Sequence, residues 1–134
     1  MRVRFRDRDG KLQTAFAAFL INGSIAFFAF LHFLIKNDGL MSLSNDFDAQ
    51  YLTFPIFANR AVREGQVFFH WAIDIGSDFI ASFGFYNLGS PFFWITLLFP
   101  PEAFPYLVAW VLMLKYVVAG LTSCLYIRQY VNQP

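Results

Sequence analysis

Two long apolar runs, at residues 14–35 and 103–127, constrain this chain more than any other feature. At a rise of about 1.5 Å per residue, a helix over either run crosses the roughly 30 Å hydrocarbon core of a bilayer. The 134-residue chain is 57% hydrophobic and only 14% charged, so one small soluble core cannot bury its apolar surface. We therefore predict an all-α membrane protein with two transmembrane helices over these runs.

A cleaved signal peptide is the alternative interpretation of the first run. Such a peptide has an apolar core of about 7 to 15 residues and a cleavage site of small residues. Here a longer apolar run is followed directly by Lys36-Asn37-Asp38. We therefore expect an uncleaved anchor.

The distribution of charge predicts how the two helices are oriented. Residues 1–11 hold five basic and two acidic side chains, whereas residues 36–102 hold three basic and seven acidic ones. Basic flanks stay on the cytoplasmic side, and Arg128 directly follows the second run. We predict that residues 1–13 and 128–134 are cytoplasmic and that 36–102 form an outer loop. The net charge of +1 gives no reason to expect a nucleic-acid partner.

The outer loop is expected to hold an interfacial helix over about residues 45–64. Asn45 or Asp46 can cap its start, apolar side chains recur on one face, and Gly65 ends it. Pro55 is expected to kink this helix because proline removes a backbone donor.

A third membrane crossing over residues 79–99 is an alternative that length alone allows. Gly89-Ser90-Pro91 divides this uncharged segment into two pieces, each shorter than the roughly 17 residues that a spanning helix needs. We therefore expect the segment to lie in the outer interface, with a second interfacial helix over about residues 91–99.

The chemistry that remains is a pair of carboxylates at the start of the first interfacial helix. The sequence has no glycine-rich phosphate loop, nucleophile elbow or Cys-x-x-Cys pair. Asp46 could act as a general base toward a sugar hydroxyl, or Asp46 and Asp48 together could hold a divalent cation. The alternative is structural: one carboxylate caps the helix and the other complements its dipole.

Lys115 lies near the middle of the second apolar run. A charge at that depth costs about 2.5 to 3.5 kcal/mol on insertion scales. Neither apolar run contains an acidic residue. We therefore expect a carboxylate or lipid phosphate from a neighbouring helix or another subunit to face this lysine.

Three runs of the chain resemble the N-terminal region of the YfhO family of bacterial membrane proteins. They are NDFDAQYLTF (45–54), WAIDIGSDFIASFGFYNLGSPFFWITLLFP (71–100) and EAFPYLVAWVLMLKYVVAGLTSCLYIRQYV (102–131). The resemblance implies a GT-C type glycosyltransferase of the bacterial cytoplasmic membrane. Such an enzyme transfers a sugar from a polyprenyl-phosphate carrier to a cell-envelope acceptor, such as a teichoic acid, on the outer face.

The resemblance also assigns roles to particular residues. An aspartate in the first outer loop is the expected catalytic base, and Asp46 matches it. Gln50 and Tyr51 match a Gln-Tyr pair that follows this aspartate in many members, and a lysine often stands at the position of Lys115. Asp48 departs from the family pattern, where a tyrosine or neutral polar residue is expected, so the resemblance gives no support to a metal-binding Asp-x-Asp pair.

Four further polar residues are candidates for substrate binding. Arg60 and Arg63 could contact the carrier phosphate or could snorkel from the interfacial helix. Asp74 and Asp78 could contact a sugar or acceptor hydroxyl or could help Gly76 form a turn.

Family members continue through many more spans. The resemblance therefore implies that this chain is the N-terminal fragment of a polytopic GT-C-like fold, inactive alone and dependent on the remaining transmembrane helices. Two other classes of function stay open. The chain could be a small non-enzymatic membrane protein with an acidic interaction loop, or a lipid-handling or transport subunit.

Overall fold

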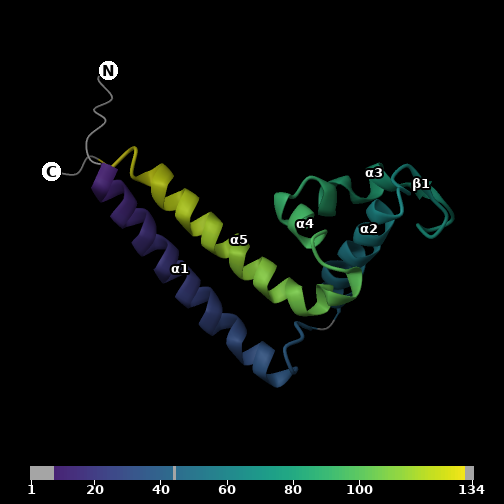
Figure 1. Ribbon diagram of the computed structural model, residues 1–134, viewed down its shortest axis with the longest axis horizontal. Coiled ribbons are helices and arrows are strands. Elements are labelled where there is room, and N and C mark those ends of the chain that lie inside the picture. Colours follow the sequence, from purple (N-terminus) through teal and green to yellow (C-terminus); the bar gives the residue numbers. More distant parts are fainter. Residues whose placement is uncertain (1–7, 44, 132–134) are drawn as a thin grey trace, which may run out of the picture. The chain divides into compact units, whose positions relative to one another are not determined.

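The computed structural model describes residues 8–43 and 45–131, and helices dominate it (Figure 1). The elements in chain order are α1 (Arg8–Lys36), η1 (Phe47–Leu52), α2 (Thr53–Arg63), β1 (Phe69–His70), β2 (Ser77–Asp78), α3 (Phe79–Phe83), η2 (Gly84–Leu88), α4 (Pro91–Thr96), η3 (Pro101–Ala103) and α5 (Phe104–Ile127). The elements η1 and η2 are π-helical, and η3 is a 3₁₀ helix. The chain divides into two compact units, the first built from α1 up to His32 and α5 from Leu112, the second from Phe33–Val111.

Two stretches of helix are long and apolar enough to cross a membrane. They are Leu12–Lys36 and Pro101–Ile127, which confirms the predicted all-α membrane fold with two candidate transmembrane helices. The segment that might have formed a third span is broken instead. It consists of an apolar helical stretch, Phe79–Leu88, and the short helix α4, with Gly89 and Ser90 between them.

In the first unit, α1 and α5 run antiparallel, with the start of α1 beside the end of α5 (Figure 1). The guanidinium of Arg128 donates hydrogen bonds to the carbonyl oxygen of Gly10 and to the Thr14 hydroxyl. Further along the pair, the rings of Phe30 and Tyr116 lie 6.0 Å apart. These contacts join the two helices at one end and along their length.

Small residues let the two helices approach closely. A Cβ added at Gly120 would overlap the side chain of Asn22, and one added at Gly23 would meet Val117 Cγ2 at 3.7 Å. The Asn22 side-chain amide donates a hydrogen bond to the carbonyl oxygen of Ala18 at 2.8 Å, so this donor has a partner within α1. The neighbour of Asn22 and Gly23 in α1 is thus α5 of the same chain.

The second unit is built around a cluster of aromatic and small side chains. Its buried members are Ala58, Ala61, Ile73, Phe79, Phe83 and Phe93. Phe57 of α2 links the others, with its ring 5.4 Å from Phe83 and 6.3 Å from Phe79. Packing of α2 against α3 and α4 through these rings holds the unit together.

The first predicted interfacial helix begins as a π-helix and becomes an α-helix at Thr53. Pro55, which is buried, follows two residues later. Proline has no N–H to donate to the carbonyl of Tyr51 four residues earlier, so the α-helical bonding pattern cannot extend unbroken through this point. A change to i→i+5 bonding on the N-terminal side accommodates the missing donor.

A short β-hairpin between α2 and α3 was not predicted. Its strands pair Phe69 with Asp78 and His70 with Ser77 in antiparallel register. The connecting turn contains Gly76 at φ +104°, a conformation that glycine adopts without strain. Strands of two residues carry too little alternation to be recognised in the sequence, although Gly76 was recognised as a turn residue.

The contact between Gly120 and Asn22 gives a first prediction. Gly120→Ala should destabilise the α1–α5 pair by about 1–3 kcal/mol, because the Asn22 side chain must turn away and break its bond to Ala18. Gly23→Ala should have little effect, because 3.7 Å is an ordinary contact distance. Unfolding of the purified chain in mixed detergent micelles measures both.

The double variant Gly120→Ala/Asn22→Ala removes the overlap and should recover most of the stability lost by Gly120→Ala alone. Equal effects of the two glycine substitutions, or no recovery in the double variant, would contradict this packing.

Candidate functional site

The carboxylates of Asp46 and Asp48 are used in different ways. Asp48 accepts hydrogen bonds from the Ser42 hydroxyl at 2.7 Å and the Leu43 backbone N–H at 3.2 Å. It therefore ties the segment after α1 to the first turn of η1. Asp46 occupies the N-cap position of η1, yet its exposed side chain accepts no capping hydrogen bond. Of the two, Asp46 has the carboxylate that is open to an incoming molecule.

A sharp turn of the backbone positions Asp46. Asn45 has φ +54°, in the left-handed region where asparagine is better tolerated than most residues. Helical conformation starts directly after it, so the Asp46 side chain projects from the very end of the helical segment. Of the structural alternative, the cap is not observed, because Asp46 makes no capping hydrogen bond. Asp48 does lie in the first turn of η1, where a carboxylate complements the helix dipole.

Gln50 and Tyr51 lie one turn further along η1. The ring of Tyr51 stacks on that of Phe47 at 5.3 Å with an interplanar angle of 9° and is half exposed. The backbone carbonyl of Gln50 accepts the N–H of Thr53 at the junction with α2. The stacked aromatic pair gives this turn a rigid, partly exposed ring surface near Asp46.

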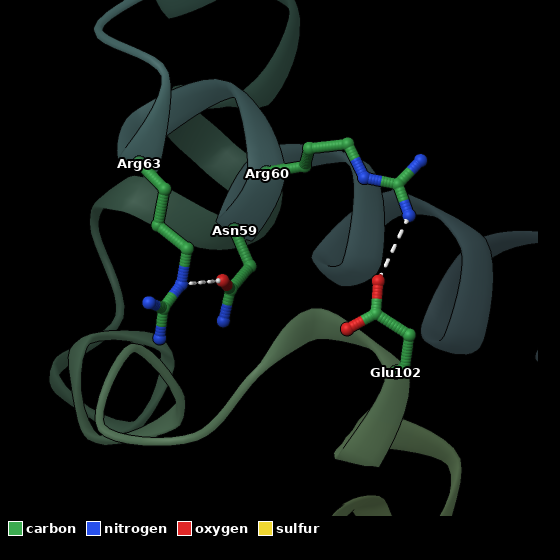
Figure 2. Close-up of polar contacts among 4 residues, drawn as sticks. All are labelled: Asn59, Arg60, Arg63 and Glu102. Carbon is green, nitrogen blue, oxygen red and sulfur yellow. Dashed lines mark hydrogen bonds and ion pairs between the residues drawn. The ribbon is translucent and has the colours of Figure 1, made fainter.

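Arg60 and Arg63, both in α2, have different surroundings (Figure 2). Arg60 forms an exposed ion pair with Glu102, with 3.3 Å between Nη2 and Oε1. Arg63 donates from Nε to Asn59 Oδ1 at 2.7 Å and from Nη2 to the carbonyl oxygens of Leu97 and Phe99. Those carbonyls follow the end of α4, so the guanidinium of Arg63 caps that helix.

The remaining candidates lie apart from the Asp46 turn in the chain. Asp74 is exposed in the hairpin turn with φ +50°. Asp78 caps α3 by accepting the N–H of Ala81 at 2.6 Å. Lys115 is a half-buried residue of α5 in the first unit.

The described residues hold no preassembled cluster of metal ligands. In residues 8–43 and 45–131, no three His, Cys, Asp or Glu side chains come together. Asp48, the natural partner of Asp46 in a cation site, uses both carboxylate oxygens in hydrogen bonds to Ser42 and Leu43.

Three buried polar residues were not singled out from the sequence: Asn59, Asn87 and Thr96. The Asn59 amide donates to the carbonyl oxygen of Thr96 at 3.1 Å while its own oxygen accepts Arg63, which links α2 to α4. Asn87 in η2 is 3% exposed, and its Nδ2 has no hydrogen-bond partner in the described part of the chain. The spacing of four residues between Asn59 and Arg63 was the available signal, because it places both on one helix face.

Residues 17–134 match the family model described as bacterial membrane protein YfhO. The chain belongs to the YfhO family. No curated protein and no solved structure gave a match. Family membership confirms the resemblance carried by the three sequence runs, and together with the two apolar helices it supports a membrane location. The family description itself names no reaction.

The two arginines of α2 provide the second prediction. Arg63→Ala should destabilise the second unit by about 1–2 kcal/mol, because it leaves the carbonyls after α4 without their donor. Arg60→Ala should cost about 0–1 kcal/mol, because its ion pair is exposed to solvent. Hydrogen exchange of residues 91–99 should accelerate in the first variant only. Equal acceleration in both would contradict the capping role of Arg63.

Proposed function

We propose that this chain is the N-terminal part of a GT-C type membrane glycosyltransferase. Its substrates would be a polyprenyl-phosphate sugar donor and a cell-envelope acceptor, a teichoic acid or similar glycopolymer, on the outer face of the bacterial cytoplasmic membrane. Membership of a bacterial membrane protein family and the two apolar helices support this class of protein. The second unit is acidic and is joined in sequence to both apolar helices. Its charged side chains support a site outside the hydrocarbon core.

The single observation that carries the proposal is the difference between the two carboxylates. A general base must be open to the hydroxyl whose proton it removes. The Asp48 oxygens already accept two hydrogen bonds, while Asp46 is exposed and makes no capping bond. Asp46 is therefore the better candidate for the base, in agreement with the resemblance.

The proposed reaction is a single displacement. Asp46 removes the proton of an acceptor hydroxyl while that oxygen attacks the anomeric carbon of the sugar. The bond between the anomeric carbon and the phosphate oxygen breaks, and its electron pair leaves with the polyprenyl phosphate. The transferred sugar inverts its configuration, and the proton rests on the Asp46 carboxyl until solvent removes it.

The other candidate residues divide into two groups under this proposal. Asp48 and Asp78 stabilise local structure, since their carboxylates hold a loop and cap a helix. Gln50, Tyr51 and Arg60 offer exposed or half-exposed groups to substrate. Arg60 suits the carrier phosphate, because its ion partner Glu102 lies on the surface and an anion can replace it.

Two candidates stay outside this division. Asp74, exposed in the hairpin turn, is a proposed contact for an acceptor hydroxyl. Lys115 of α5 is proposed to act with the further helices of the parent protein, through a carboxylate or lipid phosphate.

Asp46→Asn in the full-length parent tests the proposal. The amide keeps the size of the side chain but cannot accept the proton, so transfer should fall by about 10²- to 10⁴-fold. Membrane insertion and expression should stay normal, because the Asp46 side chain makes no capping bond. Glycosylation of the envelope polymer, measured against membrane protein level, reads out the change.

Asp48→Asn is the matched control. It weakens the bonds to Ser42 and Leu43, so it should lower stability more than Asp46→Asn while retaining most of the transfer activity. Undiminished transfer by Asp46→Asn would contradict the enzyme proposal and favour an interaction loop or a lipid-handling or transport subunit.

A further inference from the structure

The hairpin between α2 and α3 presents large apolar side chains to its surroundings. Phe68 is 71% exposed, Phe69 53%, Trp71 78% and Ile75 93%. In Figure 1 the hairpin lies at one end of the group formed by α2, α3 and α4. Four such residues within eight positions make this hairpin an apolar tip, and exposed apolar side chains at this density mark an interaction surface.

The tip is held in shape by contacts within the hairpin. The rings of Phe69 and Trp71 meet edge to face at 5.0 Å. Both rings lie over Gly76, where an added Cβ would come within 2.7 Å of Phe69 and 3.0 Å of Trp71. His70 Nδ1 accepts the Ala72 N–H at 3.1 Å, and this hydrogen bond fixes the backbone of residues 70–72. These contacts hold the aromatic pair in place at the surface of the hairpin.

The chemistry of the tip fits the interfacial layer of a bilayer. Tryptophan settles at this depth, because its apolar body is buried while its indole N–H stays wet, and phenylalanine and isoleucine add apolar contact. Both ends of the second unit continue into helices that are long enough to span a membrane. These helices keep the unit close to the membrane surface.

We propose that residues 68–76 insert their apolar tip into the outer interfacial layer of the membrane that the two helices cross. The hairpin thereby anchors the second unit at a third point. This inference does not rest on the proposed transfer reaction.

The charges of the hairpin predict which lipids it recognises. Residues 66–78 contain Asp74 and Asp78 and no lysine or arginine. Binding therefore depends on apolar contact. It should not strengthen with anionic lipid, and added salt should not weaken it.

Trp71 serves as the probe in the full chain. With Trp94→Phe and Trp110→Phe, it is the only one left of the three tryptophans. The protein is reconstituted into phosphatidylcholine vesicles brominated either near the headgroup end or near the middle of the acyl chains. We expect blue-shifted emission, with quenching roughly twofold stronger from the shallow bromines than from the deep ones. Salt and added phosphatidylglycerol should leave this pattern unchanged.

Gly76→Ala and Gly65→Ala form a matched pair. Both glycines have positive φ, but a Cβ at Gly65 meets nothing within 4 Å, whereas one at Gly76 displaces the rings. Bromolipid quenching should fall in Gly76→Ala and stay constant in Gly65→Ala. If Gly76→Ala does not fold, Ile75→Ser, which changes only an exposed side chain, should lower the quenching instead.

Three results would overturn the inference. The first is water-like emission from Trp71 with full access to acrylamide and no bromolipid quenching. The second is an emission shift that depends on the protein-to-lipid ratio without bromolipid quenching, which would indicate a second copy of the chain over the tip. The third is quenching that appears only with anionic lipid.

Discussion

Inside hydrocarbon, each backbone N–H and C=O must find its partner within the protein, and the rest of this structure depends on that constraint. It explains why the two apolar runs are long, continuous helices. It also explains why polar side chains in the helix pair bond backward along the chain, as Asn22 does to Ala18 and Thr122 to Val118. Close approach at Gly120 then allows two helices without a hydrophobic driving force between them to pack.

The second unit uses irregular backbone, which is tolerated where loops can be solvated or capped. Aromatic packing around Phe57 and Phe83 holds its short helices. Side chains satisfy the exposed helix ends, with Arg63 after α4 and Asp78 before α3. The π-helical turn at Phe47–Leu52 follows from Pro55 and lies directly after Asp46. One acidic side chain is thus left open at the end of a well-supported element.

The sequence was sufficient for features governed by length, hydropathy and backbone chemistry. The two spans, the break at Gly89 and Ser90 and the turn at Gly76 follow from such rules. Features that depend on pairing across the fold were not predictable. Arg63 looks like any surface arginine until α4 is placed beside α2, and Asp48 looks like a capping residue until Ser42 and Leu43 return to it. The roles of Asp46 and Lys115 remain predictions.

The account depends most on the placement of the second unit outside the cell, where a lipid-linked donor would meet Asp46. Labelling of single cysteines with a membrane-impermeant maleimide, in a Cys124→Ser background, tests this directly. Gln66→Cys, in the exposed loop after α2, should be labelled in intact cells, and Gln129→Cys, after α5, only once the cells are opened. Labelling of Gln129→Cys but not Gln66→Cys in intact cells would contradict the account.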